Sequence, residues 1–515
     1  MLSLEFLPVP LTWVLLPVLA LLFYIYAVHP LFVFRKMGVT GSPLPPLPII
    51  GTTYLTLLAG VYNTQYTASD FSSSVMGFFN GMTPILLISD ADMVKEILVK
   101  QFHKFVNRQR EVQDINIKPS SRQVFQLRDE DWKNVRTALT PAFSSSKLKQ
   151  MKAAMNSCAD QLVENLNSFA TTKESFDVKQ MTGAFSMDIT ARTIFGVEVN
   201  SQRDPQNPFI VHARRALDFD FKGPLVWFYL MFPSMAKPIF EMVGYHPFFK
   251  RDVTNFFDGV MDQLLAMRKT DGGKGRVDML QVMIDAHKES DDGSTEGPKV
   301  LGKKQPLSRD DVVANGIGFF SGAFDTVSIT MSFALYHLAI DQEIQDKARQ
   351  EIIEAAGNDA EVDYEAVQKM SYLEMCIMET LRLYPLATVI MRVANEDAKM
   401  KWLTVPKGMG VMVPVLAIHY DPARWNEPRK FIPERFTKEE REKRNPFDWL
   451  PFGVGPRNCV GMRLALMELK VGLAKVLMKY RVTTGPDTVV PVQLNKWKSF
   501  PTPMEPIRLR VESAN

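Results

Sequence analysis

The chain has 515 residues, of which 46% are hydrophobic and 23% are charged, and its formal net charge is only +3. This is the composition of a globular protein long enough to bury a large core, and the small charge gives no support to nucleic-acid binding. The three cysteines are far apart in sequence, which excludes a disulfide framework and a CxxC zinc site and is typical of a reducing compartment.

The first 36 residues predict a membrane anchor. No residue between Glu5 and Arg35 carries a permanent charge. A helix from Leu11 to Phe32 would span on the order of 30 Å, which is enough to cross a hydrocarbon core. Because Arg35 and Lys36 follow this span, we expect a single-pass protein whose main body is cytosolic. A cleaved signal peptide is the alternative, but it requires a basic start and a small-residue cleavage site, whereas this segment contains Glu5 and no clear Ala-x-Ala.

Residues 37–51 predict a proline-rich spacer between the anchor and the globular body. Prolines stand at positions 43, 45, 46 and 48. They favour an extended, semi-rigid chain over helix or strand. A ligand for a proline-recognising domain is the alternative, and the position directly after an anchor favours the spacer.

Residues 52–515 predict one large domain, mainly α with small β-sheets. Apolar residues recur at three- and four-residue spacing over 92–105, 131–139, 147–169, 310–339 and 342–356, which predicts helices. Alternating stretches at 84–89 and 408–414 predict strands. The run 287–308 is rich in Gly, Asp, Lys and Ser and predicts an exposed loop. We find no internal repeat and no sharp boundary within this domain.

The segment 451–461 surrounds Cys459 with three glycines and two prolines, and a helical pattern follows at 462–480. Amide groups near the start of a helix donate hydrogen bonds to a thiolate and lower its pKa. Glycines let the backbone approach a flat cofactor because no Cβ stands in the way. A lone cysteine is ordinarily a small core residue, but packing alone would not require this setting. We therefore predict a functional thiolate at Cys459.

The run Phe452-x-x-Gly455-x-Arg457-x-Cys459-x-Gly461 resembles the haem-binding signature of the cytochromes P450, the haem-thiolate monooxygenases. The resemblance implies the cytochrome P450 fold and haem b, iron protoporphyrin IX, as the cofactor. It also implies that Cys459 is the axial ligand of the iron, with Phe452 and Gly461 against the haem. A thiolate ligand favours cleavage of the O–O bond.

Two further motifs resemble structural elements of the same family. Glu379 and Arg382 are three residues apart in a helical pattern, so they share a helix face and can pair. Pro433-Glu-Arg-Phe436 supplies the matching downstream motif. A solvated surface contact is the alternative for an isolated pair. The resemblance implies a buried structural network of Glu379, Arg382 and Arg435 that braces the haem side of the core.

The carboxylates of the haem need basic partners inside the protein, and arginine suits them because its planar fork meets a carboxylate with two hydrogen bonds. The stretch from Trp132 to Arg136 resembles the family's Trp-x-x-x-Arg helix, which implies that both residues reach a propionate. The resemblance implies the same role for Arg457. Arg392 and Arg108 lie where related microsomal members have further arginines, and ordinary surface charge is the alternative for these two.

Residues 316–328 predict the helix on the opposite face of the haem. Each glycine in such an apolar helix costs about 1 kcal/mol, and Asp325 and Thr326 are polar residues in this apolar setting. A loosely packed core helix is the alternative to a groove, widened by a π-type distortion, that relays protons to dioxygen. The segment resembles the family's acid–alcohol motif, which implies Asp325 and Thr326 as catalytic residues. Ala323 and Val327 depart from that motif, where glycine and a second hydroxyl are usual.

The electrons have to come from a partner, because no Gly-x-Gly-x-x-Gly follows a predicted strand. The resemblance implies the NADPH–cytochrome P450 reductase of the endoplasmic reticulum membrane, with cytochrome b5 as a further electron donor. A basic face on the thiolate side would steer these acidic partners, and solvated charge is the alternative. Its predicted members are Lys133, Lys147, Lys149, Arg463 and Lys470.

The resemblance implies hydroxylation of apolar substrates, which are xenobiotics, steroids or fatty acids. Several aromatic residues predict an apolar roof or a membrane-dipping segment, with ordinary core packing as the alternative: Phe209, Phe219, Phe221, Phe228 and Phe232. The clan that the chain resembles includes drug and steroid hydroxylases and also thromboxane synthase. An endoperoxide isomerase that needs no external electrons, and a non-catalytic haem protein, therefore stay open. Either would leave Asp325 and Thr326 without a task, which favours the monooxygenase.

Overall fold

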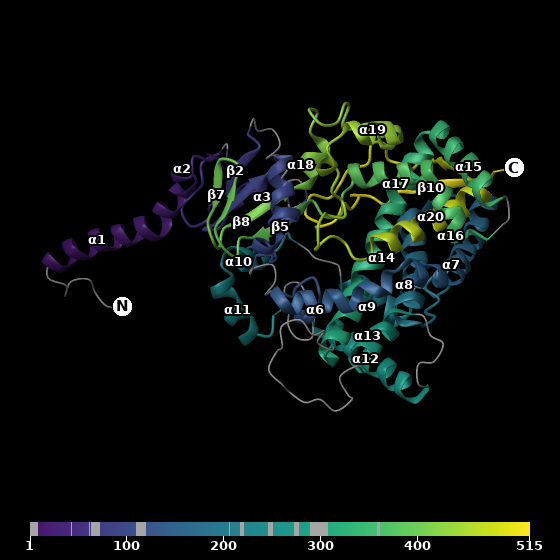
Figure 1. The fold of residues 1–515 in the computed structure, drawn as a ribbon, viewed down its shortest axis with the longest axis horizontal. Coiled ribbons are helices and arrows are strands. Elements are labelled where there is room, and N and C mark those ends of the chain that lie inside the picture. The colour runs from purple at the N-terminus through teal and green to yellow at the C-terminus, as the bar shows by residue number, and fades with distance from the viewer. Residues whose placement is uncertain are drawn as a thin grey trace.

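The computed structural model describes residues 9–42, 44–60, 62, 73–109, 120–204, 206–216, 221–245, 251–271, 278–288, 307–357 and 361–514. These residues form a mainly helical domain with small sheets, as the sequence predicts, and the N-terminal helix projects from one end of it (Figure 1). The helices that form the larger part of the domain lie on the side away from this projection.

The N-terminal helical segment is continuous but changes its pitch. It consists of α1 (Val9–Phe23), the π-helix η2 (Tyr24–Val28), the 3-10 helix η3 (His29–Phe32) and α2 (Val33–Lys36). Pro17 lies inside α1 without ending it. The stretch Trp13–Lys36 is long and apolar enough to cross a membrane, and only 6% of it is buried. A large apolar surface without cover in the domain is what a membrane anchor requires.

The largest sheet lies at the end from which α1 projects, with strand order β1-β2-β3-β8-β5 (Figure 1). Its strands are β1 (Thr40–Gly41), β2 (Val75–Asn80), β3 (Thr83–Ile88), β8 (Gly410–Pro414) and β5 (Val389–Val393). β1 pairs with β2 and β3 with β8 in parallel, whereas β2–β3 and β5–β8 are antiparallel. The predicted strands at 84–89 and 408–414 correspond to β3 and β8.

The segment predicted as a spacer is held against this sheet. Thr40 pairs with Met76 of β2, and Gly51 forms a bridge with Asn80. Phe34 of α2 packs on the same strand, where a Cβ at Gly77 would overlap its ring. This segment therefore lies along the domain, but the extended conformation expected from the prolines does not continue through residues 47–51, where Leu47 and Gly51 pair across a turn. The division into anchor, spacer and catalytic domain stays a prediction.

Two small sheets complete the β structure of the described residues. One has the order β4 (Phe176–Asp177), β10 (Arg508–Ser513), β9 (Tyr480–Thr484), and the other pairs β6 (Ala398–Met400) with β7 (Leu403–Val405). The helices before the central one are α3 (Thr53–Ala59), α4 (Ala91–Lys95), η4 (Glu96–Lys100), η5 (Phe102–Lys104), η6 (Ser120–Arg122), α6 (Asp129–Leu139), η7 (Thr140–Phe143), α7 (Ser145–Thr172), α8 (Val178–Thr190), η8 (Ala191–Phe195), α9 (Pro208–Ala216), α10 (Pro224–Met231), α11 (Pro233–Met242), α12 (Arg251–Asp271) and α13 (Met279–Lys288).

The helix α14 (Arg309–Ile340) runs through the core and packs against α8, α17 and α20. A capping box between Ser308 and Asp311 fixes its start. The helices that follow it are α15 (Gln342–Ala356), α16 (Tyr364–Lys369), α17 (Ser371–Leu383), α18 (Val415–Tyr420), η9 (Pro433–Phe436), α19 (Lys438–Lys443), η10 (Pro446–Asp448) and α20 (Met462–Lys479). The predicted helices at 310–339 and 342–356 are thus confirmed.

Two predicted elements differ from the structure. The helix expected at 92–105 is divided into α4, a π-helical turn and a 3-10 turn, because the apolar spacing does not specify the pitch. The loop expected at 287–308 begins later, since His287 and Lys288 still belong to α13. Most of that loop lies outside the described residues.

Candidate active site

The loop between η10 and α20 presents Cys459 at the start of a helix. Gly455 has a φ of 79°, and a Cβ there would overlap the carbonyl oxygen of Leu98, so only glycine fits. The Cys459 N–H donates to the oxygen of Phe452 at 2.8 Å and closes the loop. The glycine-rich setting predicted from sequence is therefore a backbone requirement of this loop.

The sulfur of Cys459 is the exposed thiol of the three, while Cys158 and Cys376 are buried. Burial of the loop raises the pKa of Cys459, and the N–H of Gly461 and the charge of Arg136 lower it. The thiol of Cys459 is therefore accessible although protein surrounds it. Burial raises the pKa of Cys158 to about 12 and that of Cys376 well above its usual value, as expected of core thiols.

Phe143 connects this loop with the central helix. Its ring packs against Phe319 of α14 with centroids 5.8 Å apart, and its edge lies 3.5 Å from the position of a Cβ on Gly461. The cysteine loop and α14 therefore meet through one aromatic side chain. This is the arrangement expected for a cofactor with the cysteine on one face and α14 on the other.

Arg457 and Arg392 have buried donors without an acceptor. The Nε and Nη1 of Arg457 and the Nε of Arg392 have no hydrogen-bond partner among the described residues. Burial and the charge of Arg392 lower the pKa of Arg457 to about 9, and burial lowers that of Arg392 to about 10. Burial and both of these charges lower the pKa of Arg108 well below its usual value. Three crowded cations, two of which have unused donors, fit a group that brings carboxylates, as the haem propionates would.

The remaining predicted propionate residues surround this cluster. The guanidinium of Arg457 lies over the ring of Trp132, 4.6 Å from its centroid. Arg136 donates from Nη2 to the Asn458 side chain at 3.0 Å, directly beside the cysteine. Arg108 stacks over the ring of Phe125 at 3.7 Å and donates to its carbonyl oxygen. The five predicted basic or aromatic residues thus occupy one region, and their contact with a haem stays a prediction.

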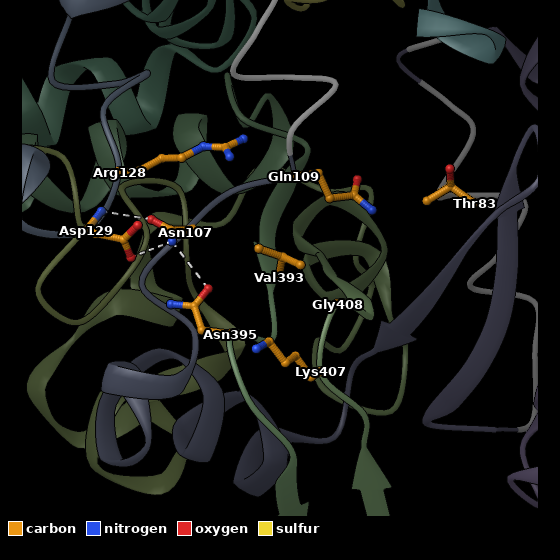
Figure 2. Close-up of a pocket in the computed structure, with 9 residues that line it drawn as sticks. All are labelled: Thr83, Asn107, Gln109, Arg128, Asp129, Val393, Asn395, Lys407 and Gly408. Atoms are coloured by element: carbon orange, nitrogen blue, oxygen red, sulfur yellow. Dashed lines mark hydrogen bonds between the residues drawn. The ribbon is translucent and has the colours of Figure 1, made fainter. Parts of the chain in front are cut away.

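A polar pocket of about 510 Å³ opens beside these arginines (Figure 2). Asn107 organises its wall: its Nδ2 donates to Asp129 at 2.7 Å and to Asn395 at 3.2 Å, and its Oδ1 accepts from the Asp129 N–H. Asp129 of the pocket wall interacts electrostatically with Arg457, so the pocket lies close to the arginine cluster. No pattern in the sequence predicts this pocket. Its lining residues are Thr83, Asn107, Gln109, Arg128, Asp129, Val393, Asn395, Lys407 and Gly408.

The predicted acid–alcohol pair lies at the middle of α14, beside an open space. Gly322 is exposed, and a Cβ there would meet no atom within 4 Å. Thr326 donates from Oγ1 to the oxygen of Gly322 at 2.7 Å. The carboxylate of Asp325 lies 3.2 Å from the Nζ of Lys179 in α8. The acid therefore pairs with a cation of α8, and the hydroxyl lies one helical turn from the free space at Gly322.

The π-type distortion expected in this helix is wrong, because α14 is α-helical from end to end. Glycines make room in a different way. A Cβ at Gly316 would clash with Met261, and one at Gly318 would crowd Gln123 at 3.0 Å. Two glycines thus admit neighbouring side chains, and Gly322 alone leaves free space next to the pair.

Glu379, Arg382 and Arg435 meet in one buried network. Arg382 donates to both oxygens of Glu379, at 2.7 and 2.8 Å, and Arg435 donates to the same carboxylate at 3.2 Å. The Ile432 N–H adds a further hydrogen bond to it. Arg382 also donates to the carbonyl oxygens of His419 and Pro428. The saturated carboxylate supports a structural role.

One expectation about a surface residue is wrong. Lys470, expected on a basic face, is buried and donates to the carbonyl oxygen of Val367 at 3.0 Å, because it lies on the face of α20 that packs into the domain. Phe209 packs in the core, as the alternative to an apolar roof or a membrane-dipping segment expects, and its ring lies 4.7 Å from that of Phe320. Phe219 lies outside the described residues.

Sequence reasoning missed several residues that contact the predicted site: Lys179, His419, Asn458 and the pocket wall around Asn107. Asn458 adjoins the cysteine, so its position gave a usable signal. Lys179 and His419 lie far from their partners in sequence, and a single lysine or histidine carries no pattern of its own.

The comparisons with known proteins agree with this geometry. The family model described as Cytochrome P450 matches residues 42–511. Cytochrome P450 3A12 of Canis lupus familiaris is 36% identical over 501 residues, which cover 97% of this chain and 96% of that protein. Cytochrome P450 3A11 of Mus musculus is 37% identical over 501 residues, with the same coverage. Cytochrome P450 3A9 of Rattus norvegicus is 36% identical over 502 residues, covering 98% of this chain and 96% of the rat protein. The chain therefore belongs to the cytochrome P450 family, the haem-thiolate monooxygenases that hold haem b through a cysteine thiolate.

Proposed function

We propose that this cytochrome P450 is a membrane-anchored monooxygenase of the endoplasmic reticulum that hydroxylates apolar substrates with dioxygen and NADPH-derived electrons. The observation that carries the proposal is that the chain has residues suited to hold a haem and also residues suited to deliver protons. An accessible Cys459 lies next to arginines with unused donors, and Asp325 and Thr326 lie beside an open space in α14. An isomerase or a haem-binding scaffold would need only the haem-holding residues.

The bound haem supplies the redox chemistry with dioxygen, and its thiolate ligand favours O–O cleavage. The chain's own residues hold this group and move protons. Arg457 and Arg392 would bind its carboxylates with the donors that are otherwise unused. Thr326 would place its hydroxyl at the open space, and Asp325 would pass protons toward it from the side on which Lys179 lies.

Apolar substrates suit the surroundings of that space. Gly322 faces it from α14 without a side chain, and the nearby acid is already paired with Lys179. No unpaired charge of these residues remains to select an ionic substrate. We therefore propose xenobiotics, steroids or fatty acids as the substrate class.

The test is a reconstitution of the purified protein with NADPH–cytochrome P450 reductase, NADPH and a panel of apolar substrates, with and without cytochrome b5. Substrate-dependent NADPH consumption with a hydroxylated product supports the proposal. Turnover of an endoperoxide in the absence of NADPH would show an isomerase, and haem binding without any turnover would show a scaffold. Either of these results overturns the monooxygenase.

We also propose that α11 touches the same membrane as α1. Met242 is 80% and Val243 64% exposed, and α10 and α11 lie at the end of the domain from which α1 projects (Figure 1). Exposed apolar residues gathered near an anchor favour contact with lipid. The test is vesicle flotation of protein lacking residues 1–36, with Met242→Asp and Val243→Asp together. These substitutions should release the truncated protein, whereas Met267→Asp in α12 should not; equal flotation of all three forms would contradict the contact.

A further inference from the structure

We infer that His419 is a positioning residue. It ties Leu450, the residue before the cysteine loop, to the Glu379–Arg382 network, and this contact sets the position of the thiolate. This inference rests on the proposed role of Cys459 as the haem ligand. His419 lies in the last turn of α18 and is fully buried. It stands between Arg382 of α17 and Leu450, which precedes the loop.

The partners of the two ring nitrogens fix the tautomer of His419. Nδ1 lies 3.0 Å from the carbonyl oxygen of Arg382, which can only accept, so Nδ1 carries the proton. Nε2 is then an acceptor, and the Leu450 N–H donates to it at 3.0 Å. Neither ring nitrogen is left without a partner, and each serves the main chain of a different motif.

The contact with α17 is reciprocal. Arg382 donates from Nη1 to the carbonyl oxygen of His419 at 2.8 Å, while His419 donates from its ring to the carbonyl oxygen of Arg382. The same guanidinium is held by both oxygens of Glu379. The imidazole is therefore attached to a rigid, fully hydrogen-bonded part of the core.

From Leu450 the hydrogen bonds continue to the cysteine. The oxygen of Leu450 accepts from the Gly453 N–H at 3.0 Å, and the oxygen of Phe452 accepts from the Cys459 N–H at 2.8 Å. Holding the Leu450 N–H thus fixes the start of the turn whose end carries the thiol. The simpler interpretation is that His419 is an ordinary core residue whose hydrogen bonds are satisfied. That interpretation does not require one ring nitrogen to bond the main chain of Arg382 and the other to bond that of Leu450.

Only a neutral imidazole can serve this role, because an imidazolium has no acceptor for the Leu450 N–H. Burial and the charge of Arg382 lower the pKa of His419 to about 3. The ring therefore stays an acceptor at neutral pH.

Three substitutions separate the two hydrogen bonds. His419→Gln keeps an acceptor at the position of Nε2 for Leu450. His419→Asn keeps only a donor at the position of Nδ1 for Arg382, and His419→Leu keeps neither. The readout is the ratio, in the reduced and CO-bound protein, of haem that shows the red-shifted band of a thiolate complex to haem that shows the band of a protonated or lost ligand.

The acceptor is the group that holds the loop, so His419→Asn and His419→Leu should each lower the ratio of thiolate to non-thiolate complex about tenfold, with His419→Gln close to wild type. His337→Leu is the control, because His337 is a half-buried histidine that is hydrogen-bonded to Tyr384 at 3.1 Å and lies in α14 rather than beside the loop. It should lower the melting temperature and leave the ratio unchanged.

The outcomes separate the inference from the proposed function. A wild-type protein without the thiolate band overturns the assignment of Cys459 itself. A normal wild type together with an unchanged ratio in His419→Asn, or an equal loss in His337→Leu, overturns the role of His419. If His419→Leu yields no folded protein, the difference between the Gln and Asn variants decides alone.

Discussion

The Nζ of Lys179 lies 3.2 Å from Oδ1 of Asp325, so the acid proposed for proton delivery is held by a cation of α8. The lysine is 41% exposed and the aspartate 16%. The pair therefore joins the protein surface to the middle of α14. An ion pair with one exposed member contributes only about 0–1 kcal/mol to stability, which leaves orientation of the carboxylate as its main effect.

Lys179→Met should slow product formation without unfolding the protein. The carboxylate of Asp325 would lose the contact that fixes its rotamer, and a misplaced proton donor lowers the rate of proton transfer. We expect less product per NADPH, with substrate affinity and melting temperature unchanged. Lys152→Met is the control, since Lys152 is about as exposed as Lys179 and its pair with Glu361 at 3.5 Å lies away from α14. Equal rates in both variants would refute an orienting role.

Thr326→Ala should separate NADPH consumption from product formation. The hydroxyl donates only within its own helix, at 2.7 Å to Gly322 and 3.1 Å to Ala323, so its loss costs little stability. A positioned proton-transfer group is worth roughly 10²–10⁴ in rate, and we expect product per NADPH to fall at least about tenfold. Thr326→Ser keeps the hydroxyl and should restore most of the coupling. Unchanged coupling in the alanine variant would show that the relay lies elsewhere.

Local pattern was enough to predict those parts of the fold and the site that depend on neighbours in sequence. The helices α14 and α15 follow from apolar spacing, and Glu379 and Arg382 share a helix face by their spacing alone. The pairing of Lys179 with Asp325 joins two distant helices, and nothing in either segment encodes it. Lys470 also shows that a local pattern does not predict long-range packing. A lysine in a helical pattern is expected to be exposed, but the packing of α20 buries this one against Val367.

Removal of Glu379 should destabilise the protein strongly. Its carboxylate compensates two buried guanidinium groups, and breaking such a pair costs roughly 3–5 kcal/mol. Glu379→Ala should therefore melt well below wild type and lose haem as it unfolds. Glu440→Ala is the comparison, because its pair with Lys443 lies at the surface and should contribute little to stability. Similar melting temperatures for the two variants would mean that the network does not brace the core.

Arg457→Met should weaken haem retention while sparing the apoprotein. The Nε and Nη1 of Arg457 lack acceptors among the described residues, although Nη2 donates to the carbonyl oxygen of Leu127, and the neighbouring Arg392 repels its charge. We expect haem to transfer to apomyoglobin about tenfold faster from the variant, since one charge-assisted hydrogen bond is worth about 1.5–3 kcal/mol. The apoprotein should melt at the same temperature as wild type or higher. A variant apoprotein that melts lower would show that the arginine is a structural residue rather than a propionate partner.

Glu468→Gln should stabilise the protein at alkaline pH and have little effect in acid. Glu468 of α20 is buried and accepts a hydrogen bond from Ser186 at 2.6 Å, and burial raises its pKa from 4.5 to about 8. Because the folded-state pKa lies above the unfolded one, the folded protein holds a proton that the unfolded chain releases between these values. The contribution of this bound proton to the free energy of unfolding is complete below pH 4.5 and is lost as the pH rises toward 8. A glutamine cannot ionise, so the free energy of unfolding of the variant should exceed that of wild type increasingly over this interval, as measured by urea denaturation. Parallel pH profiles for the two proteins would show that Glu468 is ionised in the folded state and that a partner compensates its charge.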